Sequence, residues 1–164
     1  MFELRRKYTF FNFEETTKIR GEKKMTNEAQ SGGCLCKKIT YKFEKSHVIS
    51  AHHCHCTDCQ KSTGSGKATI LLIPNESLKI NGELKYYTVT GSAGSNISRG
   101  FCAECGSPLI SFVKENPDIK FIKAGSIDDS SWINADSNFW SSTAKSWSPV
   151  DETIHTFTHN PDFA

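Results

Sequence analysis

Apolar and polar residues alternate along several short stretches of the chain after residue 31. The alternation covers Ile39–Phe43 and Leu84–Val89, and more loosely Leu109–Val113. A period of two residues predicts β-strands, and each stretch is bounded by Gly, Pro, Asn or Asp. Ala68–Ile73 is instead continuously apolar or β-branched, which predicts a strand buried on both faces.

The remaining pattern predicts one mostly β domain with a loop-rich C-terminal third. Asn81-Gly82 is a hairpin turn signal between Leu78–Ile80 and Leu84–Val89. No stretch sustains an apolar period of about 3.6 residues, and no internal repeat is present beyond the cysteine spacing. A chain of 164 residues has the size of a single domain.

Three tryptophans lie in the polar C-terminal stretch, at Trp132, Trp140 and Trp147. Their large apolar rings predict anchors for a long segment that wraps over an edge of the sheet. The adjacent acids Asp128-Asp129 are typical of a turn.

Residues 1–30 form an N-terminal extension that precedes a predicted domain at residues 31–164. Basic residues outnumber acidic ones over residues 1–24, and no apolar stretch followed by a cleavage site marks a signal peptide. One hypothesis is that translation begins at Met25, because codons for Gly21–Lys24 can spell a purine-rich ribosome-binding site. A solvated, partly disordered arm is the alternative.

The charge balance argues against a nucleic-acid partner, and the length of the apolar runs argues against a membrane anchor. The net charge is +2, and no basic stripe with interleaved aromatic residues indicates nucleic-acid binding. The longest apolar run, Ile70–Ile73, is far shorter than the roughly 20 residues that cross a bilayer. We expect a cytoplasmic protein whose thiols face a reducing compartment.

The seven cysteines are the most informative residues. They occur as Cys34-Leu35-Cys36, as Cys54-His55-Cys56-Thr57-Asp58-Cys59 and as Cys102-Ala103-Glu104-Cys105. Seven disulfide partners would leave one cysteine unpaired, and partners one residue apart would form strained rings. Metal ligation is therefore the preferred interpretation. Thiolates suit zinc or iron–sulfur clusters, and the absence of a ferredoxin-type run favours zinc.

The spacing predicts a closed site of four sulfurs. Cys34 and Cys36 would point to the same face of a strand, which supplies two ligands. Cys102 and Cys105, followed by Gly106, have the spacing of a zinc knuckle and supply two more. We expect this zinc to be structural and to hold two ends of the sheet together.

Cys54, Cys56 and Cys59 remain as three ligands for a second zinc. Three protein ligands leave a fourth position for water or substrate, which is typical of catalytic zinc. The alternative is that a nearby histidine, His52, His53 or His55, supplies a fourth ligand and makes this site structural too.

Four groups of residues between positions 31 and 150 form a joint pattern: Gly33-Cys34-x-Cys36, His53-Cys54-His55-Cys56-x-x-Cys59-Gln60-Lys61 with Gly64, Arg99-x-Phe101-Cys102-x-x-Cys105-Gly106-Ser107 and Gly125-Ser126-Ile127-Asp128-Asp129. This pattern resembles that of the glutathione-dependent formaldehyde-activating enzyme family, also called the centromere protein V family. The resemblance implies an Mss4-like β fold. It also implies a structural zinc at Cys34, Cys36, Cys102 and Cys105, and a catalytic zinc at Cys54, Cys56 and Cys59.

The resemblance further implies addition of glutathione to formaldehyde, giving S-(hydroxymethyl)glutathione, an activity of the carbon–sulfur lyase class. Lys61 and Arg99 would pair with glutathione carboxylates, and Gln60 would hydrogen-bond its amides. Ser62 and Thr63 are further candidates for amide contacts. Two other interpretations stay open: a lyase acting on another thiol adduct, and a non-catalytic zinc module that binds a protein.

Overall fold

The computed structural model describes residues 27–91 and 93–161 of the chain. Residues 1–26 lie outside the described residues, so the disordered arm and the start at Met25 both stay predictions. The domain boundary at residue 31 is likewise a prediction. Within the described residues, the helices are too short and too polar to span a lipid bilayer.

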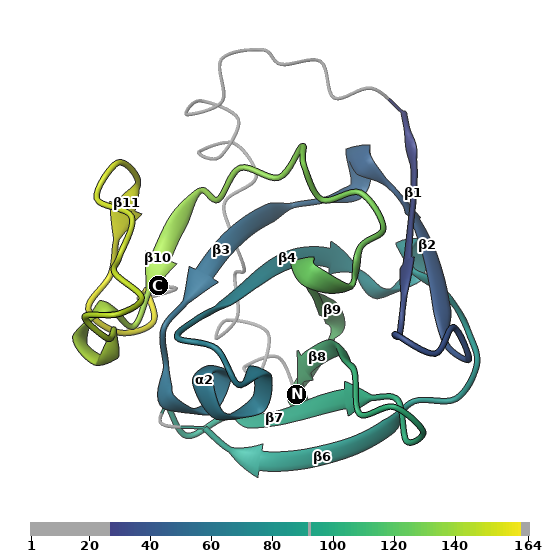
Figure 1. Cartoon of the computed structure of the whole chain (residues 1–164), viewed down its shortest axis with the longest axis horizontal. Helices are drawn as coiled ribbons and strands as arrows, with labels where there is room; N and C mark the ends of the chain where they lie inside the picture. Colours follow the sequence, from purple (N-terminus) through teal and green to yellow (C-terminus); the bar gives the residue numbers. More distant parts are fainter. Residues whose placement is uncertain (1–26, 92, 162–164) are drawn as a thin grey trace, which may run out of the picture.

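A small antiparallel sheet has the strand order β1-β2-β5. Its strands are β1 (Ala29–Gly33), β2 (Thr40–Glu44) and β5 (Lys79–Asn81). In Figure 1, β1 and β2 stand at one side of the molecule, and the larger sheet curves away from them.

The large sheet has the strand order β11-β10-β3-β4-β9-β8-β7-β6. Its strands are β3 (Ser50–Cys54), β4 (Ala68–Pro74), β6 (Lys85–Thr90), β7 (Asn96–Phe101), β8 (Pro108–Val113), β9 (Asn116–Lys123), β10 (Ser137–Phe139) and β11 (His155–Thr156). Strand β10 runs parallel to β3 and β11, and the other neighbours are antiparallel. The mostly β fold class is confirmed, and the Mss4-like fold stays a prediction.

The continuous apolar run forms β4, as predicted, and lies inside the large sheet between β3 and β9. Successive side chains of a strand point to opposite faces. Leu71 and Ile73 therefore enter one apolar cluster, together with Tyr41 of the small sheet, while Ile70 and Leu72 enter another on the opposite face. Because both faces of β4 pack against apolar residues, its sequence is apolar at successive positions and does not alternate between apolar and polar residues.

The alternating stretches also form strands, at β2, β6 and β8, with ends within one residue of the predicted ones. The predicted hairpin at Asn81-Gly82 is wrong. The strand before it, β5, pairs with β2, and the strand after it, β6, pairs with β7. Gly82 has a φ of +97° and marks the crossing from the small sheet to the large one. A turn signal identifies the change of direction but not the partners of the strands.

One α-helix, α2 (Thr57–Thr63), follows β3 and was not predicted. Seven residues are too few to establish an apolar period. Two residue types that are common at helix ends do occur here, because Asp58 lies in the first turn and Gly64 ends the helix with a φ of +65°. Among the described residues, short 3-10 helices occupy Lys45–His47, Asn75–Ser77, Ala124–Ser126 and Ser141–Thr143.

The tryptophan prediction holds in part. Trp132 packs against the core between the two sheets and donates to Gln30 Oε1 at 2.9 Å. Trp140 follows the short strand β10 near the sheet edge, packs on the second apolar cluster and donates to Asn160 Oδ1 at 2.6 Å. Trp147 is 70% exposed, so the prediction that it anchors the wrapping segment is wrong.

The contact of β1 with the segment after β9 generates a stability prediction. Gly32 is buried and bridges to Ile127, and a Cβ at this position would overlap the Ser126 carbonyl oxygen and the Tyr41 side chain. We expect Gly32→Ala to lower the free energy of unfolding by about 1–3 kcal/mol, as overpacking does. Gly125→Ala is the matched control, because a Cβ there meets no atom within 4 Å. Chemical denaturation measures both variants, and equal stability of the two would contradict the packing.

Two candidate metal centres

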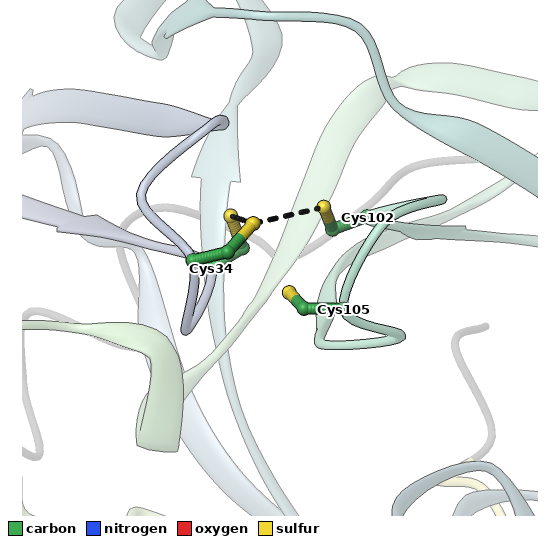
Figure 2. A group of neighbouring side chains, drawn as sticks. Cys34, Cys102 and Cys105 are labelled. Atoms are coloured by element: carbon green, nitrogen blue, oxygen red, sulfur yellow. Dashed lines mark hydrogen bonds between the residues drawn. The ribbon is translucent and has the colours of Figure 1, made fainter.

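Four cysteine sulfurs converge from two loops that are far apart in the sequence. The Cys34, Cys36, Cys102 and Cys105 sulfurs all lie within 4.8 Å of one another. Cys34 and Cys36 sulfurs are 3.5 Å apart, and those of Cys36 and Cys102 are 3.7 Å apart. Figure 2 shows the Cys34, Cys102 and Cys105 side chains turned toward one another. Tetrahedral zinc with bonds of about 2.3 Å places its sulfurs roughly 3.8 Å apart, so the cluster has the spacing that zinc needs.

The first loop holds its cysteines in a turn, not on a strand. Strand β1 ends at Gly33, so the predicted strand geometry of Cys34 and Cys36 is wrong. The Lys37 N–H donates to the Cys34 carbonyl at 3.0 Å, and Lys37 has a φ of +64°. The Ile39 N–H donates to the Cys34 sulfur at 3.2 Å. The tight turn brings the two sulfurs together where the alternation of a strand was expected to do so.

The second loop follows the knuckle pattern read from the sequence. The Gly106 N–H donates to the Cys102 carbonyl at 2.9 Å, and Gly106 has the left-handed φ of +73° that glycine adopts without strain. The Ser107 hydroxyl lies 3.2 Å from the Cys105 sulfur. Hydrogen bonds from the Ser107 side chain and backbone lower the pKa of Cys105 to about 5.

The four-cysteine cluster joins the two sheets, which corrects the expectation that it joins two ends of one sheet. Its first loop connects β1 and β2 of the small sheet, and its second connects β7 and β8 of the large sheet. The Leu35 N–H donates across to Ser107 Oγ at 3.1 Å, and Lys38 pairs with Glu104 at 2.7 Å. The exposed ion pair contributes little to this connection. A metal ion bound by the four sulfurs would add to the apolar packing between the sheets.

The second cluster forms where β3 passes into α2. Cys54 ends β3, Cys56 caps the helix, and Cys59 lies within its first turn. Their sulfurs lie within 4.8 Å of one another, and the Cys59 N–H donates to the Cys56 sulfur at 3.3 Å. Hydrogen bonds from Cys54 and Cys56, with the nearby charges of Lys123 and Arg99, lower the pKa of Cys59 to about 3. Sharing of protons among close thiols raises the pKa of Cys54.

No histidine joins the three sulfurs among the described residues. His52 lies between two hydroxyls, at 2.8 Å from Ser50 Oγ and 2.9 Å from Ser137 Oγ. His53 Nδ1 is 2.9 Å from Thr69 Oγ1. His55 is fully buried, and this burial lowers the pKa of its ring. The geometry therefore gives no support to a histidine as fourth ligand.

Both donor sets consist of thiols, which are soft ligands consistent with zinc. None of the seven cysteines is in a disulfide, and the sulfur separations far exceed a disulfide bond of about 2.05 Å. The two clusters are therefore fitted to bind two metal ions.

Two cations lie on the same face of the large sheet as Cys54. Directly opposite residues of neighbouring strands share a face, as do residues two apart along a strand. The connecting pairs are Cys54 with Ala68, Ile70 with Lys123, Phe121 with Ser111, and Ser111 with Arg99. Lys123 was not identified from the sequence. The sequence does contain one signal for it, because Lys123 directly follows the apolar residues Phe121 and Ile122, which are typical of a buried strand.

The residues predicted to bind glutathione have different settings. Gln60 Nε2 donates to the backbone carbonyls of His55 at 2.6 Å and Thr143 at 2.9 Å, so its amide N–H groups support the loop around the cysteines. The Lys61 side chain is exposed. Arg99 is mostly buried and lies 3.4 Å from Asp58 in the first turn of α2. Their roles in binding glutathione stay predictions.

Two cavities lie beside these residues. A wide cleft of about 1140 Å³ includes Cys34 and Ser107 from the four-cysteine loops, and His53 and Thr63 from the segments flanking the three-cysteine cluster. A smaller cavity of about 310 Å³ is lined in part by Arg99 and Tyr87. Lys123 lines both cavities.

Comparisons with known proteins identify one family. The family model described as glutathione-dependent formaldehyde-activating enzyme matches residues 29–143. The comparison with curated proteins finds no match. Among solved structures, the crystal structure of a Rhodobacter sphaeroides protein, a structural genomics target, is similar with a TM-score of 0.48 and 20% identity. That likeness covers 63% of this chain and 90% of that chain.

The different settings of the two clusters predict different effects of losing one cysteine. Cys34→Ser removes a ligand from the cluster that joins the sheets, where metal binding contributes about 10 kcal/mol or more to folding in small zinc domains. We expect an insoluble or unfolded protein. Cys56→Ser alters a loop on a sheet held together elsewhere, so we expect a soluble protein with near-native circular dichroism and about one zinc fewer. Elemental analysis and circular dichroism decide, and equal collapse of both variants would show that both metals are structural.

Proposed function

Because this chain belongs to the glutathione-dependent formaldehyde-activating enzyme family, we propose that it joins a small thiol such as glutathione to formaldehyde or another small aldehyde. The product is an S-hydroxymethyl thiol adduct or its homologue. The observation that carries the proposal is the three-cysteine cluster, which no histidine joins among the described residues. The cysteines themselves line neither cavity, but their neighbours do: His53 and Thr63 line the wide cleft, and Ser62 lines the smaller cavity.

The chemistry requires a thiolate next to an aldehyde. A free thiol with a pKa near 8.5 is only a few per cent thiolate at neutral pH. Zinc held by Cys54, Cys56 and Cys59 would supply a fourth position at which a substrate thiol loses its proton. The four-cysteine cluster holds the second zinc, which we propose to be structural, giving two per chain.

The chain itself supplies positioning. The wide cleft has room for a tripeptide, and its lining includes the hydroxyl of Thr63 and the cation Lys67. Lys61, whose side chain is exposed, and Arg99, which lines the smaller cavity and not the cleft, are proposed to pair with glutathione carboxylates. Gln60 is proposed to contact its amides through Oε1, because Nε2 is used by the protein. Holding two reactants side by side is a large part of the work in such an addition.

Formation and cleavage of a carbon–sulfur bond place the proposed activity in the carbon–sulfur lyase class. A cytoplasmic location is part of the proposal, since thiol ligands persist in a reducing compartment. The same site could act on another thiol adduct, which is the second candidate within this class.

The main prediction is acceleration of adduct exchange. With ¹³C-formaldehyde and glutathione, we expect the zinc-loaded protein to raise the exchange rate between hydrated formaldehyde and the S-hydroxymethyl adduct, in proportion to protein concentration. The measurement is ¹³C exchange spectroscopy, which separates catalysis from equilibrium binding. Cys56→Ser should return the rate to that of the protein-free solution. A zinc-loaded wild-type protein without effect on exchange of any thiol adduct would exclude the proposed activity.

A non-catalytic zinc module predicts a different response to chelators. The four-cysteine cluster is closed by four protein ligands, whereas the proposed open site has three, so an enzyme should lose one zinc first. We expect a competing chelator to remove one zinc quickly, with the circular dichroism unchanged, and the second slowly, together with unfolding. Release of both ions at a single rate would favour the module.

A further inference from the structure

Lys123 is a buried cation that the proposed function does not use. It is the last residue of β9, and only 8% of its surface is exposed. Its ammonium group donates to Ser111 Oγ at 3.1 Å, and this is its hydrogen-bond partner within residues 27–91 and 93–161. Burial lowers the pKa of Lys123, and the nearby cysteine thiolates oppose that shift. A buried ammonium group with two N–H donors left over needs an anion or a polar ligand.

Arg99, which the proposed function already pairs with a carboxylate, has guanidinium donors that the described part of the protein does not satisfy. Its Nη1 is buried without a hydrogen-bond partner in the described part of the chain. Its Nη2 reaches Asp58 at 3.4 Å, longer than the about 2.7–2.9 Å of a well-formed charge-assisted hydrogen bond. The arginine therefore has a loose partner on one nitrogen and a desolvated, unused donor on the other.

Both cations line the smaller cavity. Its walls are otherwise Ser62, Tyr87, Gly100, Phe101, Gly106, Pro108 and Ile110, and no carboxylate of the protein is among them. A volume of about 310 Å³ is at the lower end for small-molecule sites and well above the size of formaldehyde. An apolar cavity with two cations at one side is suited to an organic anion whose charged group faces the cations.

The location connects this cavity with the three-cysteine cluster. The side chains of Lys123 and Arg99 share a face of the large sheet with Cys54. Lys123 and Pro108 are in the lining of both the wide cleft and the smaller cavity.

We propose that Arg99 and Lys123 form a carboxylate-binding subsite, and that a reactant of the three-cysteine site carries an acid group that lies in the smaller cavity. The assignment of the ligand as a reactant rests on the proposed function, whereas the binding of a carboxylate does not. The carboxylate could belong to the thiol or to the aldehyde, since both sources present the same group to the two cations.

Binding to the full-length, zinc-loaded protein tests the subsite without measuring turnover. Calorimetric titration compares 3-mercaptopropionate with its methyl ester for the thiol source, and glyoxylate with acetaldehyde for the aldehyde source. In at least one pair, we expect the acid to bind about tenfold tighter or more, as the loss of charged hydrogen bonds implies. The acid preference should shrink to near unity in Lys123→Met. Lys114→Met, an exposed lysine after β8, is the control for net charge and should keep the preference.

The outcomes separate the subsite from other roles. If Lys123→Met does not fold, Arg99→Gln is measured instead and should lose the same preference. Equal affinity for acid and neutral ligand in both pairs overturns the proposal. Zinc loss in Lys123→Met with the acid preference intact after reloading would overturn it too, and would assign Lys123 as counter-ion of the metal centre. An acid preference without any acceleration of adduct exchange would leave the subsite standing and remove the proposed function.

Discussion

Convergence of four cysteine sulfurs between two sheets is the contact on which this structure depends. The β1–β2 loop belongs to the small sheet and the β7–β8 loop to the large one, and the cluster holds the two loops together. The apolar core between the sheets, with Tyr41, Leu71 and Ile122 among its most buried residues, lies behind this connection. A tetrahedral metal would impose one relative placement of the loops, which an apolar contact alone specifies less sharply.

The second face of the large sheet has a different character. There the apolar residues Ile70, Leu72 and Phe139 surround the three-cysteine cluster, and Lys123 and Arg99 extend the same face toward β7. The three thiols, the two cations and the smaller cavity are thus brought together on one face of the large sheet, apart from the four-cysteine cluster that joins the two sheets. This separation allows the candidate active site to keep unused donors, which a structural site would not tolerate.

Several local features could be predicted because they depend on neighbours in the sequence. The β2, β6 and β8 strands follow from alternation, β4 from its continuous apolar run, and the Cys102–Gly106 turn from glycine's access to a positive φ. The errors concern partners. Asn81-Gly82 is a turn whose flanking strands belong to different sheets, and Trp147 is an aromatic residue without a place in the core. The helix α2 was too short for its apolar period to be seen.

The sequence by itself determined the ligand chemistry, the division of seven cysteines into groups of four and three, and the mostly β class, because spacing and periodicity are properties of the local chain. Only the tertiary structure decided which sheets the four-cysteine cluster joins, and that Lys123 and Arg99 face the other three cysteines. The order and register of the strands determine which side chains share a face of the sheet. Order and register depend on pairing between segments far apart in the chain, such as Ile70 with Lys123. A buried lysine is recognised as a candidate binding group only when that pairing shows what surrounds it.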